Sequence, residues 1–325
     1  MGEISRRQLQ FGGLAAMLAS GFAADRAVAQ GYPNRLVKVI IPFAAGGSTD
    51  AVTRPLLEAL HRQLGQPFVI ENRGGAGSVV GTAQVATSPP DGYTLLSTTA
   101  SFVTTMVAQQ QTYSLESFDT VAMLTQSPFT ILVTAQSPIR TIDDLVKLAR
   151  EKNGNLAYAT AGAGSSTHFA TEYFCMRTGI RMQHVPYRGI GPALIGLLRD
   201  DVNVMITTPA SASGQIQDGS IRVVAYTAPG IPEGFPVAPI VKDTGLDYQV
   251  TSWWAMLGPR GIPAEVRTLL NGAINNLLKT PEMAKIYRTI GSAPAPMGLD
   301  EFMKMLTTET AQFAEVAKFA DIKIE

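Results

Sequence analysis

Residues 37–64 constrain the fold most, because the chain changes there from strand-forming to helix-forming residues across one glycine-rich turn. The β-branched run VKVII comes first, the turn occupies residues 44–50, and apolar residues then recur at every fourth position along one helical face. This order predicts a buried strand, a tight turn and a helix start. Such a helix start favours anions, because its unpaired backbone N–H groups lie at the positive end of the helix dipole.

The same order of strand, small-residue turn and helix recurs further along the chain. A second glycine turn at residues 72–78 follows the strand FVIE, and the strand at 93–97 ends in small polar residues. Residues 156–160 form another strand and lead into the turn AGAGSSTH at 161–168. We therefore expect an α/β fold with mainly parallel sheets flanked by helices, in which a ligand lies beyond the carboxyl ends of the strands.

Length and composition limit the possible classes of protein. The 325 residues suffice for one large or two ordinary domains, and a net charge of zero gives no long-range attraction to nucleic acid. No apolar run after the N-terminus reaches the roughly 18 residues of a membrane span. The single cysteine, Cys175, excludes an internal disulfide and a multi-cysteine metal site, and three histidines supply few further ligands. We expect no metal and no cofactor.

Residues 1–29 have the pattern of an export signal. Arg6 and Arg7 precede an apolar stretch at residues 11–24, and Ala27-Val28-Ala29 follows the small-x-small rule for cleavage. Paired arginines are typical of the twin-arginine route. We expect a periplasmic mature protein that begins at Gln30; a buried N-terminal helix is the alternative.

Two stretches are predicted to cross between two lobes. The first is the strand at residues 130–134, and the second is the apolar run SWWAMLGP at 252–259. They divide the mature chain into a discontinuous first lobe, residues 30–129 plus 253–325, and a second lobe, residues 130–252. The last part of the first lobe is predicted to be helical.

Five segments together carry a resemblance to a known family. They read YPNRLVKVIIPFAAGGSTD, GQPFVIENRGGAGSVVG, PDGYTLL, HVPYRGIGPAL and SWWAMLGPRGIP, in this order. With these segments the chain resembles the Bug-type extracytoplasmic solute receptors, the substrate-binding components of tripartite tricarboxylate transporters. The resemblance implies a two-lobe, Venus-flytrap receptor without catalysis that holds a small carboxylate, either a di- or tricarboxylate or an aromatic acid. Its implied partners are the integral-membrane subunits of the transporter, with no nucleic acid, and we expect a monomer.

The resemblance places the ligand between the first turn and the turn at 161–168, which the strand and helix pattern also indicates. Hydroxyls beside free backbone N–H groups can hold a carboxylate without an arginine, since a hydrogen bond to a charged group contributes about 1.5–3 kcal/mol. The candidate ligand-binding residues are Phe43, Gly46, Gly47, Ser48, Thr49, Asp50, Ser101, Ala163, Gly164, Ser165, Ser166, Thr167, His168, Arg188, Thr207 and Thr208.

Several of these candidates have a purely structural interpretation as well. The turn before Asp50 is also compatible with a plain strand-to-helix connection, and Asp50 either caps the helix, orients the turn, or receives an amine or a water. His168 either packs within the fold or donates to a carboxylate. Phe43 forms a cleft wall or part of the core, and Arg188 is the candidate charged partner of an acidic ligand.

The sequence departs from the family pattern at one position near the cleft. Family members often carry Asp-Asn after the strand that precedes Thr207 and Thr208, so a ligand of different shape or polarity is expected. Pro55 removes an N–H early in the opening helix, where a kink is possible. Trp253 and Trp254 are expected to pack at the interdomain crossing, and Cys175 to be an inert core thiol.

A periplasmic α/β enzyme, either an oxidoreductase or a hydrolase, is the alternative function. Residues 75–81 resemble a loosened dinucleotide fingerprint after a strand, but an exported protein rarely meets nicotinamide cofactors. The sequence contains no G-x-S-x-G, Walker A or H-E-x-x-H motif. A ligand-sensing partner of a signalling protein is a third interpretation.

Overall fold

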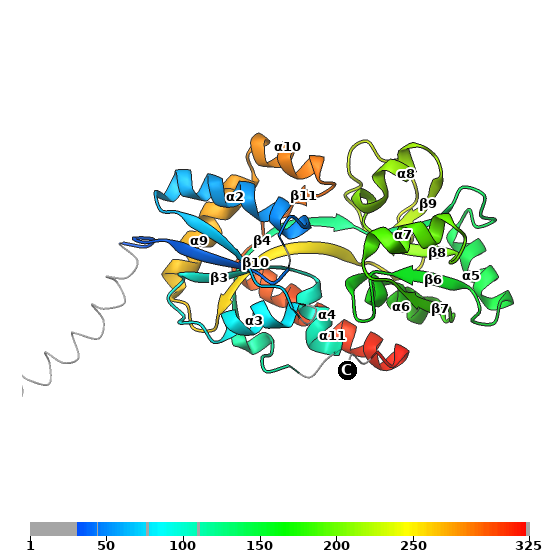
Figure 1. Ribbon diagram of the computed structural model, residues 1–325, viewed down its shortest axis with the longest axis horizontal. Helices are drawn as coiled ribbons and strands as arrows, with labels where there is room; N and C mark the ends of the chain where they lie inside the picture. The colour runs from blue at the N-terminus through cyan, green and yellow to red at the C-terminus, as the bar shows by residue number, and fades with distance from the viewer. Residues whose placement is uncertain (1–30, 44, 76–77, 109–110, 323–325) are drawn as a thin grey trace, which may run out of the picture.

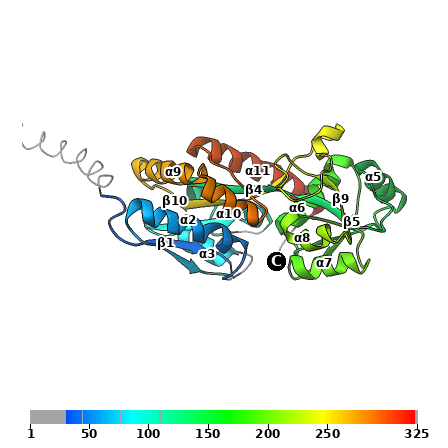
Figure 2. The ribbon, with the colours of Figure 1, turned by 90° about the horizontal axis from the view of Figure 1, so that it is seen from above.

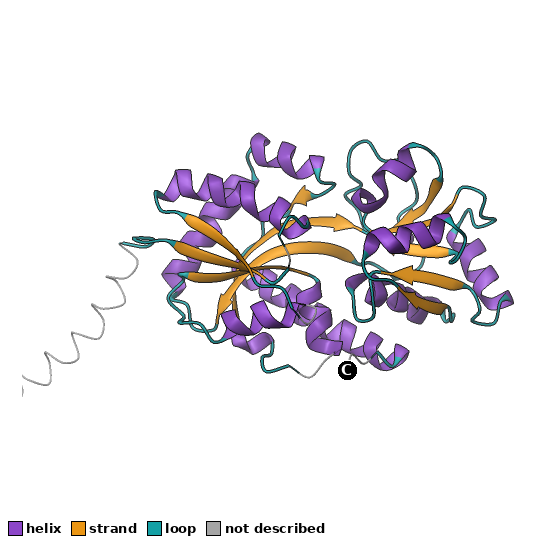
Figure 3. Ribbon diagram, viewed as in Figure 1, coloured by secondary structure: helices purple, strands orange, loops and turns teal. Residues whose placement is uncertain are grey.

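The computed structural model describes residues 31–43, 45–75, 78–108 and 111–322 as two lobes, each with one sheet flanked by helices (Figures 1 and 3). The predicted two-lobe α/β architecture is thus confirmed. The predicted export signal lies outside the described residues, and so do Ala44, Ala76 and Gly77 of the first two glycine turns. Among the described helices, none combines the length and the hydrophobicity that crossing a bilayer requires.

The first lobe is built on a six-stranded sheet with the order β11-β4-β10-β3-β1-β2. Its strands are β1 (Val37–Ile41), β2 (Phe68–Asn72), β3 (Thr94–Thr99), β4 (Phe118–Pro128), β10 (Thr251–Pro259) and β11 (Ala293–Pro294). Its helical segments are α2 (Ser48–Leu64), α3 (Val79–Ala86), α4 (Ser101–Ala108), η2 (Leu115–Ser117), α9 (Ala264–Leu278), α10 (Pro281–Thr289) and α11 (Leu299–Ala320). Helix α2 is one continuous element although it contains Pro55.

The second lobe is built on a five-stranded sheet with the order β7-β6-β8-β5-β9. Its strands are β5 (Thr130–Thr134), β6 (Ala157–Thr160), β7 (Gln183–Pro186), β8 (Val204–Thr207) and β9 (Ile221–Tyr226). Its helical segments are α5 (Ile142–Glu151), α6 (Ser166–Thr178), α7 (Ile190–Leu198), η3 (Pro209–Ala212), α8 (Ser213–Gln217) and η4 (Val241–Thr244).

Both sheets are mixed, because the strands that connect the lobes run against their neighbours. In the first sheet β1 pairs in parallel with β2 and β3, whereas β10 is antiparallel to both β3 and β4. In the second sheet β6 pairs in parallel with β7 and β8, whereas β5 is antiparallel to β8 and β9. The expected parallel pairing therefore holds within the βα units and fails where the chain passes from lobe to lobe.

The lobes are joined by the long strands β4 and β10 and by helix α11. The chain changes sheets between Pro128 and Thr130, and it returns between Tyr226 and Thr251. Helix α11 lies along both lobes in Figure 2, and its Phe313 contacts Phe169 of α6 with ring centroids 5.3 Å apart. The domain limits given above stay a prediction, and α11, which that prediction assigns to the first lobe, also packs on the second.

Local sequence determines several of the element ends. Thr141 caps α5, since its hydroxyl accepts from the Asp144 N–H and the Asp144 carboxylate accepts from the Thr141 N–H. Gly179 ends α6 in the left-handed conformation that glycine favours. Cys175 is fully buried in this helix, in agreement with the expected core thiol.

Candidate functional site

A cavity of about 600 Å³ lies between the two lobes. The first lobe contributes the segments that follow β1 and β3, the face of β10 and the end of α10. The second lobe contributes the starts of α6 and α7 and the segment after β8. The carboxyl ends of β1 and β3 therefore border the cavity, which is where ligands lie in open α/β sheets.

Nine of the predicted site residues line this cavity. They come from both turns, from the start of α4 and from the end of β8, and they are Phe43, Gly47, Ser48, Thr49, Ser101, Ser166, Thr167, Thr207 and Thr208. Ser48 is the first residue of α2 and Ser166 is the first residue of α6. The starts of two helices from different lobes thus face one space.

Asp50 is predicted to contact the ligand but does not line the cavity. Its buried carboxylate accepts from Asn72 at 3.0 Å and from Arg54 at 3.0 Å, while Asn72 also donates to the Phe43 carbonyl at 3.1 Å. Asp50 therefore ties the first turn to the end of β2, which matches the interpretation that it orients the turn.

The second turn is held by hydrogen bonds within itself. The Ser165 hydroxyl donates to the Gly162 carbonyl at 2.7 Å and accepts from the His168 N–H at 3.3 Å, so Ser165 caps α6. The Thr167 hydroxyl accepts from the Ala161 N–H at 3.0 Å. These bonds fix the backbone that presents Ser166 to the cavity.

His168 lies behind the second turn and does not line the cavity. Its Nδ1 accepts from the Gly164 N–H at 3.1 Å, and its ring stacks on His184 with centroids 3.8 Å apart. Burial and the neighbouring His184 lower the pKa of His168 to about 3, and burial lowers the pKa of His184 to about 4. Both rings are therefore neutral near pH 7, and in this structure His168 supports the turn.

Five further candidates also lie outside the cavity lining, namely Gly46, Ala163, Gly164, Ser165 and Arg188. Ala163 borders a separate cavity behind the second turn, together with His168 and His184. Arg188 is exposed on the surface before α7. Their contact with a ligand stays a prediction.

Eleven lining residues are absent from the sequence-based set, and most of them lie on segments far from the two turns. They are Ala51, Val52, Thr99, Phe129, Ile190, Ala210, Ser211, Ser252, Trp254, Ile290 and Ser292. Strand alternation explains why Ser252 and Trp254 share one face of β10. Trp254 is buried at the crossing as expected, but it also forms part of the cavity wall.

No described residue that lines this cavity has an ionisable side chain. The positive potential for an anion therefore comes from the backbone N–H groups at the starts of α2 and α6, beside the hydroxyls of Ser48 and Ser166. The described residues also contain no group of three His, Cys, Asp or Glu residues placed to hold a metal ion. The arrangement is suited to binding an anion through hydrogen bonds.

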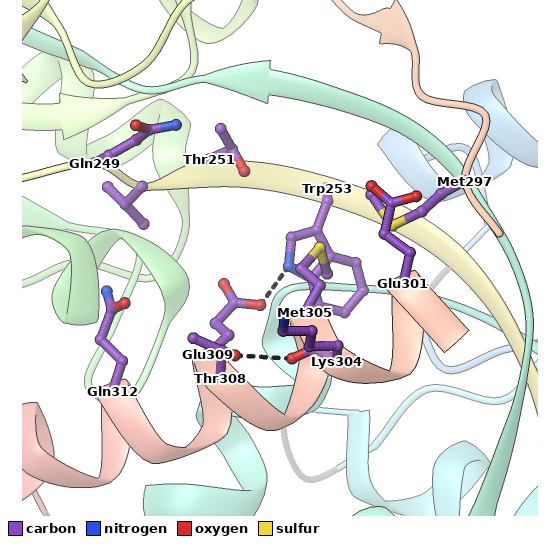
Figure 4. A pocket seen from close by; sticks show the side chains of 11 residues that line it. Gln249, Thr251, Trp253, Met297, Glu301, Lys304, Met305, Thr308, Glu309 and Gln312 are labelled. Carbon is purple, nitrogen blue, oxygen red and sulfur yellow. Dashed lines mark hydrogen bonds between the residues drawn. The ribbon is translucent and has the colours of Figure 1, made fainter. Parts of the chain in front are cut away.

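A second cavity, of about 450 Å³, lies on the opposite face of β10 (Figure 4). Thr251 and Trp253 face it from β10, and α11 forms its other wall. The Trp253 indole N–H donates to the Glu309 carboxylate at 2.7 Å. Burial raises the pKa of Glu309 to about 8, against a smaller opposing effect of this hydrogen bond.

The chain is similar over most of its length to one family of known proteins. The family model described as "Tripartite tricarboxylate transporter family receptor" matches residues 52–321. The protein BugT of Bordetella pertussis is 31% identical over 299 residues, which are 90% of this chain and 92% of BugT. A solved R. palustris protein with adipate is 30% identical with a TM-score of 0.76, over 90% of this chain and 99% of its own. MatC of Rhodopseudomonas palustris with bound malate is 28% identical with a TM-score of 0.72, over 88% and 99%.

Proposed function

Because this chain belongs to the receptor family of the tripartite tricarboxylate transporters, we propose that it captures a small carboxylate between its lobes and delivers it to the membrane subunits of such a transporter. The family resemblance seen in the sequence is confirmed by these matches. Relatives solved with adipate and with malate support a carboxylate as the ligand class.

The observation that carries the proposal is the pair of helix starts at Ser48 and Ser166 on one uncharged cavity. A carboxylate that accepts from both lobes binds the closed arrangement more tightly than an open one, so binding shifts the population towards closure. Bending is proposed to occur in the two connections at residues 128–130 and 226–251.

We also propose how the protein is exported, in which oligomeric state it acts and what happens to its ligand. The mature protein is exported to the periplasm by the twin-arginine route, acts as a monomer, and returns its ligand unchanged. A solved structure that is 28% identical to this chain, BugD, is described as a periplasmic binding protein, which supports a periplasmic receptor. A turnover assay with stoichiometric ligand tests this against the enzyme alternative, because recovery of a modified ligand contradicts a receptor.

A thermal-shift screen against mono-, di- and aromatic carboxylates tests the ligand class. A ligand at 100 times its Kd is expected to add about 2.7 kcal/mol to the free energy of unfolding, which gives a clear rise in Tm. The absence of any stabilisation across the panel would count decisively against the proposed function.

Ser48→Ala and Ser166→Ala are each expected to weaken carboxylate binding about ten- to hundredfold, because each removes a hydroxyl donor to a charged group. Isothermal titration with the strongest ligand from the screen measures the effect. Ser213→Ala is the matched control, since Ser213 begins α8 of the second lobe but does not line the cavity. Unchanged affinity in both cavity variants would show that the two helix starts do not hold the ligand.

A further inference from the structure

We propose that the cavity behind β10 is a second binding site, for an organic ammonium compound, and that Glu309 takes the positive charge of this ligand. The site goes beyond the proposed function, because it lies on the opposite face of β10 from the cavity between the lobes. Binding at the second cavity can therefore be tested without any ligand in the first.

This second cavity lies where the chain returns from the second lobe to the first. Thr251 and Trp253 face it from β10, whereas Ser252 and Trp254 line the cavity between the lobes. Successive side chains of a strand point to opposite faces, so one strand forms a wall of both cavities. Gln249 extends this wall into the connection from the second lobe, and α11 forms the opposite wall (Figure 4).

One face of α11 supplies most of the polar groups of the cavity. Its side chains recur at helical spacing and so lie in one row, which consists of Glu301, Lys304, Met305, Thr308, Glu309 and Gln312. Among the described residues that line the cavity, the acidic and basic ones are Glu301, Lys304 and Glu309. The acidic and basic residues of the neighbouring α6, namely His168, Glu172 and Arg177, do not line it. The cavity wall therefore carries two carboxyl groups and one ammonium group.

Glu309 is held in place by an indole ring and not by a cation. The Trp253 indole N–H donates to one carboxylate oxygen at 2.7 Å, and Trp253 is 1% exposed, so the core fixes the position of this bond. Within the part of the chain that the structure describes, this bond is the only interaction of the Glu309 carboxylate. Its second oxygen is therefore available to a donor in the cavity that Glu309 lines.

An ammonium ligand supplies the positive charge that this carboxylate lacks. Burial raises the pKa of Glu309 to about 8, and no charged neighbour contributes to the shift, so the carboxyl group retains its proton near pH 7. A bound ammonium ion lowers this pKa, because an opposite charge at close range favours the ionised carboxylate. The O–H bond of the carboxyl group breaks, its proton passes to the solvent, and the carboxylate and the ammonium ion form an ion pair.

The rest of the wall indicates a small ligand with a hydrocarbon body. Val250, Met297 and Met305 add apolar surface beside Trp253, and aliphatic carbons bury favourably against such a surface. The volume of about 450 Å³ is typical of sites for small molecules.

Other classes of ligand fit this cavity less well. An anion would meet two carboxyl groups and be attracted by Lys304 alone. A metal ion requires several close ligands, and the described residues contain no group of three His, Cys, Asp or Glu residues placed to hold one. An uncharged compound gains no ion pair with Glu309. The geometry thus favours a compound with one ammonium group on a short hydrocarbon chain.

Isothermal titration of the protein with n-butylammonium chloride tests the site. Butan-1-ol is the uncharged control with the same carbon chain, and potassium chloride controls for ionic strength. Near pH 9, butylammonium is expected to bind about tenfold more tightly than butan-1-ol or better. The absence of butylammonium binding, or equal binding of the two compounds, overturns the inference.

The pH dependence of this binding reports on the carboxyl group directly. The affinity for butylammonium is expected to rise about tenfold from pH 7 to pH 9, because about a tenth of Glu309 is ionised at the lower pH and most of it at the higher. Alkylammonium ions keep their charge over this range, as lysine does. Titration near pH 7 in buffers of different ionisation enthalpy is expected to show about 0.9 proton released per ligand.

Glu309→Gln and Glu301→Gln separate the proposed site from its surroundings. Glu309→Gln keeps an acceptor for the indole without a charge, and it is expected to weaken butylammonium binding near pH 9 about tenfold or more and to remove the proton release. Glu301→Gln, on the same face of α11, is expected to weaken binding less than about threefold. Melting temperatures verify that both variants fold. Unchanged affinity or unchanged proton release in Glu309→Gln would overturn the inference and leave the proposed binding of a carboxylate between the lobes intact.

Discussion

Glu309→Gln is expected to stabilise the protein at neutral and alkaline pH, by about 2 kcal/mol near pH 9. Glu309 of α11 accepts from the Trp253 indole N–H at 2.7 Å in the cavity behind β10 (Figure 4). Burial raises the pKa of this carboxyl group from 4.5 to about 8. Glutamine retains an acceptor for the indole and carries no charge, so it removes the cost of ionising the site.

The direction of the pH dependence follows from the raised pKa. The unfolded chain releases the Glu309 proton near pH 4.5, whereas the folded protein retains it up to about pH 8. The stability that the protonated group contributes is therefore complete below pH 4.5 and is lost as the pH rises towards 8. Each pKa unit corresponds to about 1.36 kcal/mol, and contact of the side chain with the open cavity reduces the total to roughly 2 kcal/mol.

Denaturant unfolding at about pH 5, 7 and 9 measures this difference in the free energy of unfolding. The gap between the variant and the parent protein is expected to widen between the first and last of these values. Glu301 and Lys304 also face this cavity from α11, and exposed Glu301 supplies the control. Glu301→Gln is expected to change the free energy of unfolding by less than about 0.5 kcal/mol. A gap of the same size at every pH would show that folding does not raise the pKa of Glu309, since the folded and unfolded chains would then bind the same number of protons across this range.

Elements with their own capping signals were predictable from the sequence. The α5 start at Thr141 and the α6 end at Gly179 depend on residues within one or two turns of each end. The two turns that border the cavity belong to the same class, since each consists of a strand, a glycine turn and a helix start that follow one another in the sequence. Their position on a shared cavity additionally requires the two lobes to face each other, which the repeated turn pattern indicated and the family resemblance implied.

Strand β4 shows what local pattern does not reveal. Local sequence pattern predicts no element for Phe118–Pro128, although this is an 11-residue strand that is buried on both faces. Its pairing partner β10 lies more than 120 residues later in the chain. Because burial on both faces removes the polar and apolar alternation, the strand carries no periodic signal of its own.

The lining residues that were not predicted also depend on pairing between segments far apart in the sequence. Ser252 and Trp254 line the cavity only because β10 inserts between β3 and β4, and Ile290 and Ser292 follow because β11 pairs with β4. The sequence left packing and ligand contact equally open for His168. In the structure its ring on α6 stacks on His184 of β7, which lies far from it in the sequence and holds it behind the second turn.

Gly291→Ala is expected to weaken ligand binding about tenfold or more, because it obstructs the contact between the lobes. Gly291 lies between the cavity residues Ile290 and Ser292 of the first lobe, and Ala210 lies opposite it in the second. A Cβ atom at Gly291 would come within 2.5 Å of the Ala210 Cβ. The Ser127 hydroxyl donates to the Gly291 carbonyl at 2.9 Å, so this segment is anchored to β4 and cannot easily move away.

Ala210→Gly in the same chain separates this clash from other effects of the substitution. The double variant lacks the obstructing atom and is expected to regain most of the lost affinity, which a double-mutant cycle measures directly. Gly291 has a φ of +67°, so alanine also introduces backbone strain there. Gly245→Ala reports such strain alone, since Gly245 has a φ of +89° and open space around it, and it is expected to leave affinity unchanged. If the single and double variants bind the ligand equally weakly, the loss of affinity comes from the backbone of this segment. Full recovery of affinity in the double variant identifies Gly291 and Ala210 as the point at which the lobes meet when the ligand is held.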